Sequence, residues 1–105
     1  MNPRLITLAE MISAQTRERL LKDWPNYCEE ILSKDCAVKI IPGKKYTKID
    51  VGTSGKYMAD AEGNIFGIKG YGVIHRGHHY GTLDTIDQWY WGGYTAVPKN
   101  RVVHD

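Results

Sequence analysis

The distribution of glycine constrains the fold of this chain most strongly. All eleven glycines lie between Gly43 and Gly93. Glycine destabilises helices but suits turns and β-bulges, so the first third can be helical while the remainder favours strands joined by tight turns. Nine of the eleven aromatic residues also lie between Tyr46 and Tyr94, and aromatic side chains are enriched in strands. The sequence therefore predicts helices followed by a β-sheet.

Residues 1–35 show the apolar spacing of amphipathic helices. Asn2 before Pro3 predicts a helix start. Pro25 should end or kink that helix, because proline lacks a backbone N–H. A second short helix should follow it. The three- and four-residue spacing and the strand alternation predict a core formed by Leu8, Ile12, Leu20, Trp24, Ile31, Ile49, Val51 and Ile65.

Residues 36–97 carry the pattern of antiparallel strands. Asp60-Ala61-Glu62-Gly63 predicts a hairpin turn with Gly63 in the left-handed conformation. Further strands are expected at 37–41, 45–51, 56–59, 64–69, 80–83 and 89–97. We predict an α+β fold in which N-terminal helices pack on a strongly curled antiparallel sheet or a small, partly open barrel. One domain should cover residues 1–105, with a helical part at 1–35, a β part at 36–97 and a tail at 98–105.

Charge and cysteine content narrow the functional classes. The net charge is only +2, but residues 37–81 contain seven Lys or Arg against three Asp or Glu. The basic character is therefore local. Cys28 and Cys36 are too few for a disulfide framework, and we expect both to be reduced and buried. The chain lacks an export signal and a long apolar run. These features predict a cytoplasmic protein that binds no membrane.

Residues 67–81, with the sequence GIKGYGVIHRGHHYG, contain five glycines beside basic side chains. We expect a loop whose accessible N–H groups and cationic donors bind an anion. The predicted ligand-binding residues are Lys69, Tyr71, Arg76, His78, His79 and Tyr80. The glycines are equally compatible with sheet corners and bulges. No dinucleotide fingerprint or P-loop ending accompanies them.

The histidines of this segment suggest two other chemistries. His75, His78 and His79 can ligate a metal with Asp84, Asp87 or His104, but the cysteine-containing ligand pairs of structural zinc sites are missing. We therefore expect no metal and no cofactor. The same histidines can act as acid and base in a phosphodiesterase or nuclease. No recognised catalytic motif accompanies them, so we assign no catalytic residue.

A second surface is predicted from lysines and tryptophans. Lys44, Lys45 and Lys48 lie on or before one strand, and Trp89 and Trp91 share one face of another. Basic residues combined with aromatic rings are typical of nucleic-acid and partner interfaces. One face of the aromatic strand must nevertheless pack into the core.

Residues 43–83 combine a Lys-Tyr-x-Lys-Ile strand, a Gly-Asn-Ile hairpin exit and a basic segment closing on glycine. The residues that form these features are Lys45, Tyr46, Lys48, Ile49, Gly63, Asn64, Ile65, Arg76 and Gly81. In these features the segment resembles a set of short, uncharacterised bacteriophage and prophage proteins. The family favours Lys-Ala-Pro-Ala-Lys-His where this chain has VIHRGH at 73–78. The resemblance implies a phage accessory protein, such as an antagonist of host defence in the host cytoplasm, and no particular activity.

Together these features predict a small binding protein that captures an anionic ligand, a nucleotide or nucleotide-derived signal, without turning it over. The first alternative is a module that binds nucleic acid or a host defence protein. The second is the histidine-dependent phosphodiesterase or nuclease. The oligomeric state, including a homo-oligomer, is left open.

Overall fold

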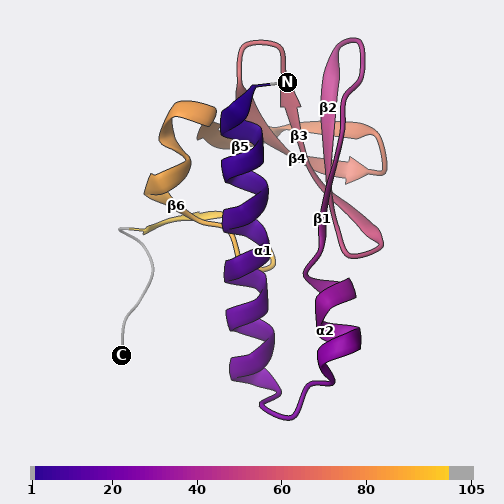
Figure 1. Ribbon diagram of the computed structural model, residues 1–105. Helices are drawn as coiled ribbons and strands as arrows, with labels where there is room; N and C mark the ends of the chain where they lie inside the picture. Colours follow the sequence, from indigo (N-terminus) through magenta and orange to yellow (C-terminus); the bar gives the residue numbers. More distant parts are fainter. Residues whose placement is uncertain (1, 100–105) are drawn as a thin grey trace.

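A computed structural model describes residues 2–99 of the chain. Two helices precede a five-stranded sheet, and a short 3-10 helix and a two-stranded ribbon follow it (Figure 1). In chain order the elements are α1 (Pro3–Asp23), α2 (Glu29–Asp35), β1 (Val38–Ile41), β2 (Tyr46–Val51), β3 (Ser54–Asp60), β4 (Asn64–Gly70), β5 (Val73–Thr82), η1 (Leu83–Gln88), β6 (Trp89–Tyr90) and β7 (Val97–Pro98). No helix within 2–99 is both long and apolar enough to cross a membrane.

The start of α1 forms as its sequence predicts. The Asn2 side chain accepts a hydrogen bond from the Arg4 N–H, and Pro3 occupies the first turn. The helix ends at Asp23, two residues before Pro25. Along its length α1 buries a single stripe of residues, namely Leu5, Leu8, Ile12, Thr16 and Leu20.

The large sheet is an antiparallel meander in the order β1-β2-β3-β4-β5. The α+β class is therefore confirmed. The predictions of a strongly curled sheet and a partly open barrel are wrong, because β1 and β5 remain at opposite edges and the sheet does not close. Asp60 explains the tight β3–β4 turn: its Oδ1 accepts from the N–H groups of Glu62 and Asn64, and Gly63 has φ of +88°.

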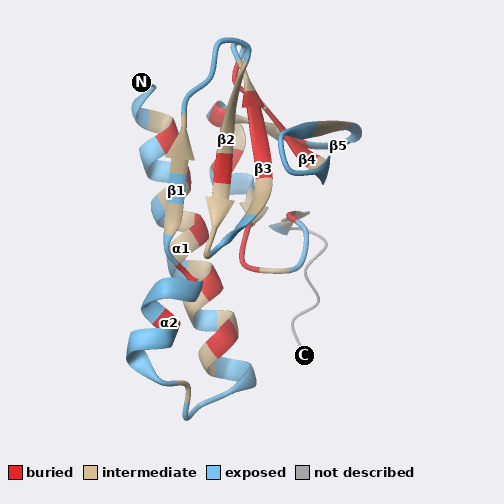
Figure 2. Ribbon diagram, turned by 90° about the vertical axis from the view of Figure 1, so that its right-hand side faces the viewer, coloured by how far each residue is buried: buried red, intermediate tan, exposed pale blue. Residues whose placement is uncertain are grey.

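The core lies between α1, one face of the sheet and η1 (Figure 2). Predicted core residues Leu8, Ile12, Leu20, Ile49 and Ile65 are buried, and Val51 is partly buried.

Three predicted burials in the helical part are wrong. Trp24 and Ile31 are 57% and 54% exposed, and Cys28 is exposed as well. The last turn of α1 and the whole of α2 extend beyond the end of the sheet (Figure 2), so the sheet does not cover these side chains. In α2 the buried residue is Leu32. Cys36, which follows the helix, is buried as predicted.

The glycine-rich segment 67–81 is not a loop. Most of it belongs to β4 and β5, which are joined at Tyr71 and Gly72, where Gly72 has φ of +76°. Phe66 pairs with His79 while the next residue, Gly67, pairs with His75. Residues 76–78 therefore form a bulge in β5. The glycines of this segment therefore lie in a turn and in an irregularly paired part of the sheet, as one of the two interpretations of the sequence predicted.

The predicted strand 89–97 is also interrupted. It contains only the short β6 and β7, which pair with one another, and the segment between them turns back toward α1. A Cβ on Gly92 would lie 2.5 Å from the Gln15 carbonyl oxygen, so this approach requires glycine. The predicted connection 84–87 lies within η1, whose capping box links Thr82 and Thr85. Most of the predicted tail, including His104, lies outside the described residues.

Candidate functional site

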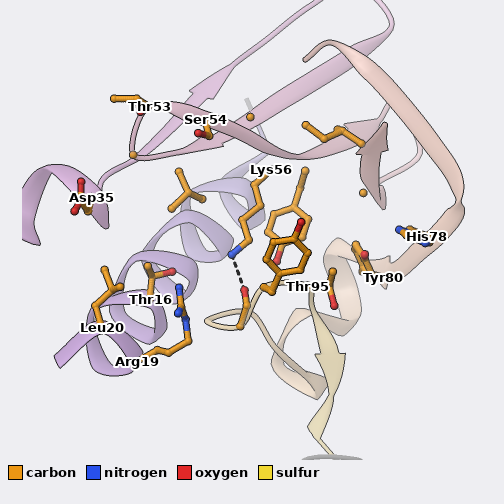
Figure 3. A pocket seen from close by; sticks show the side chains of 18 of the residues that line it. Thr16, Arg19, Leu20, Asp35, Thr53, Ser54, Lys56, His78, Tyr80 and Thr95 are labelled. Carbon is orange, nitrogen blue, oxygen red and sulfur yellow. Dashed lines mark hydrogen bonds between the residues drawn. The ribbon is translucent and has the colours of Figure 1, made fainter. Parts of the chain in front are cut away.

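A cavity of about 650 Å³ lies between the second half of α1, the start of β3, the β5 bulge and residues 93–95 (Figure 3). We call it the Lys56 cavity. Lys56 occupies its middle, while Asp35 lies at one end and His78 and Tyr80 lie at the other. Its volume is typical of pockets that hold small molecules.

Lys56 is the most unusual polar group of the cavity. Its amine is partly buried and donates a hydrogen bond of 2.8 Å to the Gly93 carbonyl oxygen. Burial, and to a lesser extent the nearby positive charge of Arg19, lower the pKa of Lys56 from 10.5 to about 8. A carbonyl oxygen carries only a partial negative charge, so this hydrogen bond does not neutralise the ammonium.

Arg19 reaches the same segment from α1. Its Nε donates to the Gly92 carbonyl oxygen, and its Nη1 lies 3.8 Å from Asp23 on the next helical turn. In Figure 3, Lys56 comes from the strand above the segment and Arg19 from the helix to its left. The two ion pairs found within 2–99 are Arg17–Glu29 and Arg19–Asp23, so Lys56 has no carboxylate partner there.

Two buried hydroxyl groups also belong to the lining of the cavity. Thr16 Oγ1 and the Tyr57 hydroxyl each lack a hydrogen-bond partner among the described residues. The rings of Tyr80 and Trp91 contact Tyr57 edge-on, with centroids 5.7 and 5.4 Å away. Burial raises the pKa of Tyr57, so its hydroxyl stays neutral and able to donate. Leaving buried hydroxyls unpaired costs about 1–3 kcal/mol each, which favours a site completed by a ligand.

The structure divides the six predicted ligand-binding residues between two faces of the sheet. His78 and Tyr80 line the Lys56 cavity, and His78 stacks on His75 with ring centroids 4.0 Å apart. Lys69, Tyr71, Arg76 and His79 are exposed elsewhere. The β5 bulge causes this separation, because it turns residues of one short segment in different directions.

Arg76 and Tyr71 lie instead beside lysines of the second predicted surface. The Tyr71 hydroxyl donates to Asp50 at 2.9 Å, and the Lys48 amine lies 5.0 Å from the Tyr71 ring centroid. The Arg76 guanidinium lies over the rings of Tyr46 and Phe66.

The lysines and the tryptophans of the second predicted surface do not lie together. Lys44 and Lys45 are exposed between β1 and β2. Trp91 is fully buried, and its Nε1 donates to the Ile86 carbonyl oxygen. Trp89 is half-buried beside Tyr80, with centroids 5.9 Å apart. The structure therefore places Trp91 in the core rather than on a partner surface.

The sequence interpretation missed Lys56, Arg19, Thr16 and Tyr57. They carry no local motif, and long-range packing alone brings them together. Within 2–99, no group of three or more His, Cys, Asp or Glu side chains is placed to hold a metal ion.

Comparison with known proteins adds no relative from which a function can be transferred. The sequence matches no family model, and neither curated proteins nor solved structures give a match. A functional assignment must therefore come from the chemistry of the chain's own residues.

Proposed function

We propose that the Lys56 cavity binds a small anionic ligand and releases it unchanged. The observation that carries this proposal is the amine of Lys56, which is partly buried, lacks a carboxylate partner within the described chain and points into a cavity. Arg19 contributes a second positive charge at the same segment. An anion between them would accept charge-assisted hydrogen bonds, which are about twice as strong as neutral ones.

The hydroxyl groups complete this site. Thr16 and Tyr57 offer donors that have no protein partner in residues 2–99. A phosphate or carboxylate oxygen has several lone pairs and can accept from both a cation and a hydroxyl. The ligand would thereby satisfy two unpaired donors as well as two charges, and its affinity should depend on all four groups.

The cavity also favours a ligand with a planar group. Tyr57 and Tyr80 line its wall, where both rings are buried, and Tyr94 lies at its rim with 96% of its surface exposed. An exposed ring such as that of Tyr94 can stack on a base, typically contributing about 1–3 kcal/mol per base. A nucleotide or a nucleotide-derived signal combines such a ring with phosphate. Sequestering such a signal is the role that a phage accessory protein of this type would have in its host.

Calorimetric titration with AMP, ADP, cyclic AMP and inorganic pyrophosphate tests the proposal. At least one of these should bind better than millimolar at pH 7. Lys56→Met should weaken that binding at least tenfold, because it removes the charge and keeps most of the side-chain volume. Lys22→Met is the matched control, since Lys22 is exposed in the last turn of α1 and outside the cavity.

Two results would contradict the proposal. One is the absence of submillimolar binding across the panel, and the other is equal binding by Lys56→Met and wild type. Chromatography of the ligand after incubation separates binding from the phosphodiesterase alternative. If the cavity only binds the ligand, the ligand should be recovered intact.

A further inference from the structure

The face of the sheet opposite α1 has a chemistry that the Lys56 cavity does not use. Cross-strand pairing aligns Lys48 with Met58, Met58 with Phe66 and Phe66 with His79, so these side chains form one row across β2 to β5. Their chain neighbours Ile49, Tyr57 and Ile65 belong to the core cluster on the α1 side. Because side chains alternate along a strand, the row faces away from α1. We call this side, together with Lys45, Tyr46, Tyr71 and Arg76, the outer face.

Cations lie over aromatic rings of the outer face, where Tyr71 is exposed and Phe66 is buried beneath Arg76. The Lys45 amine lies 5.5 Å from the Tyr46 ring centroid, and the Lys48 amine lies 5.0 Å from that of Tyr71. The Arg76 guanidinium lies 5.9 Å from the Tyr46 centroid and 5.6 Å from that of Phe66. These contacts hold the basic side chains close to ring faces without neutralising them.

The positive side chains of the outer face, Lys45, Lys48 and Arg76, form no ion pair in the described part of the chain. Both ion pairs recorded between residues 2 and 99 belong to α1 and its partners in the helical part. Two strand carboxylates lie nearby: Asp50 accepts from the neutral Tyr71 hydroxyl, and Asp60 accepts from the β3–β4 turn. Burial opposes the ionisation of Asp60, but hydrogen bonds from Asn64 and Glu62 and the positive charge of Arg76 lower its pKa overall. Neither carboxylate forms an ion pair with the three cations, so an external polyanion can still contact Lys45, Lys48 and Arg76.

We propose that the outer face binds single-stranded nucleic acid. Lys45, Lys48 and Arg76 would contact successive phosphates, and bases would stack on Tyr71, which is 60% exposed. Single-strand binding surfaces generally combine a basic track with aromatic platforms in this way. This combination of basic side chains and aromatic rings favours nucleic acid over an acidic protein. A duplex keeps its base faces stacked inside, so a single strand fits better.

Fluorescence anisotropy with a labelled 12-nucleotide oligothymidylate tests this proposal against an abasic strand of equal length. Oligothymidylate should bind at least tenfold more tightly than the abasic strand. Its affinity should fall about 20-fold between 50 and 200 mM salt if about three phosphates are contacted. Lys45→Gln changes an exposed side chain and should reduce both the affinity and the salt dependence, whereas Lys22→Gln should change neither.

Tyr71→Leu tests the stacking step separately. It should remove most of the preference for oligothymidylate over the abasic strand. Lys56→Met should leave oligonucleotide binding unchanged, which distinguishes the outer face from the cavity.

Three results would overturn the proposal: no binding at 100 μM protein, equal affinity for the two strands, or equal loss in Lys45→Gln and Lys22→Gln. Polyglutamate binding as tightly as oligothymidylate would replace nucleic acid with an acidic protein partner.

Discussion

Raising the pH from 7 to 9.5 should stabilise the wild-type protein relative to Lys56→Met. Lys56 is the group responsible, because the folded state lowers the pKa of its amine to about 8 from an ordinary value of 10.5. Between these values the unfolded chain holds more protons than the folded chain, so the free energy of unfolding rises with pH. Below pH 8 the amine is charged in both states, and the folded state bears the full free-energy cost of burying this charge. Above about pH 10.5 the amine is neutral in both states, and this cost is absent.

The size of this effect follows from the two pKa values. At about 1.4 kcal/mol per pH unit, the gap corresponds to about 3 kcal/mol of destabilisation at neutral pH. The amine keeps part of its solvent contact, and screening by water should reduce the cost to about half. We therefore expect wild type to gain roughly 1 kcal/mol relative to Lys56→Met between pH 7 and 9.5.

Urea unfolding at the two pH values measures this gain. Tryptophan fluorescence is a suitable signal, because Trp91 is fully buried and becomes exposed on unfolding. The Lys22→Met control should keep a constant difference from wild type. A constant difference for Lys56→Met as well would show that the folded state does not destabilise the charged form of Lys56.

Three further substitutions test the packing. Ile49→Ala should cost about 2–5 kcal/mol in denaturant unfolding, because Ile49 is 1% exposed in the core; a neutral result would mean that the β2 face is assigned in reverse. Gly92→Ala should cost about 1–3 kcal/mol, since its Cβ would meet the Gln15 backbone, and an unchanged urea midpoint would argue against this close approach. Trp24→Ala should change the free energy of unfolding by no more than about 0.5 kcal/mol, as expected for an exposed side chain; a larger loss would mean that Trp24 is packed in the core.

Local signals accounted for the elements that the sequence predicted correctly. Asn2 and Pro3 start α1, Asp60 and Gly63 form the β3–β4 turn, and alternation along β2 places Ile49 inward. Each of these depends on a few neighbouring residues.

The incorrect predictions depended on distant packing. Trp24 and Ile31 have helical spacing that fits a buried face, but the sheet does not extend to cover them. The β5 bulge is set by pairing with β4, so the segment 67–81 alone did not reveal that His78 and Arg76 face different sides.

The Lys56 cavity could not be predicted from the sequence for the same reason. Lys56 and its acceptor Gly93 are 37 positions apart, and Arg19 and its acceptor Gly92 are 73 apart. Neither Lys56 nor Arg19 belongs to a recognisable sequence motif. Only the fold shows that both side chains meet one backbone segment.

The pKa of the Lys56 amine, measured by NMR of lysine-labelled protein with and without inorganic pyrophosphate, tests the proposed anion site most directly. Without the anion the pKa should be about 8. Saturating pyrophosphate should raise it by at least about one pH unit, because a neighbouring negative charge favours the charged amine. A Lys56 pKa that stays the same at saturating pyrophosphate would contradict the proposal that this cavity binds anions.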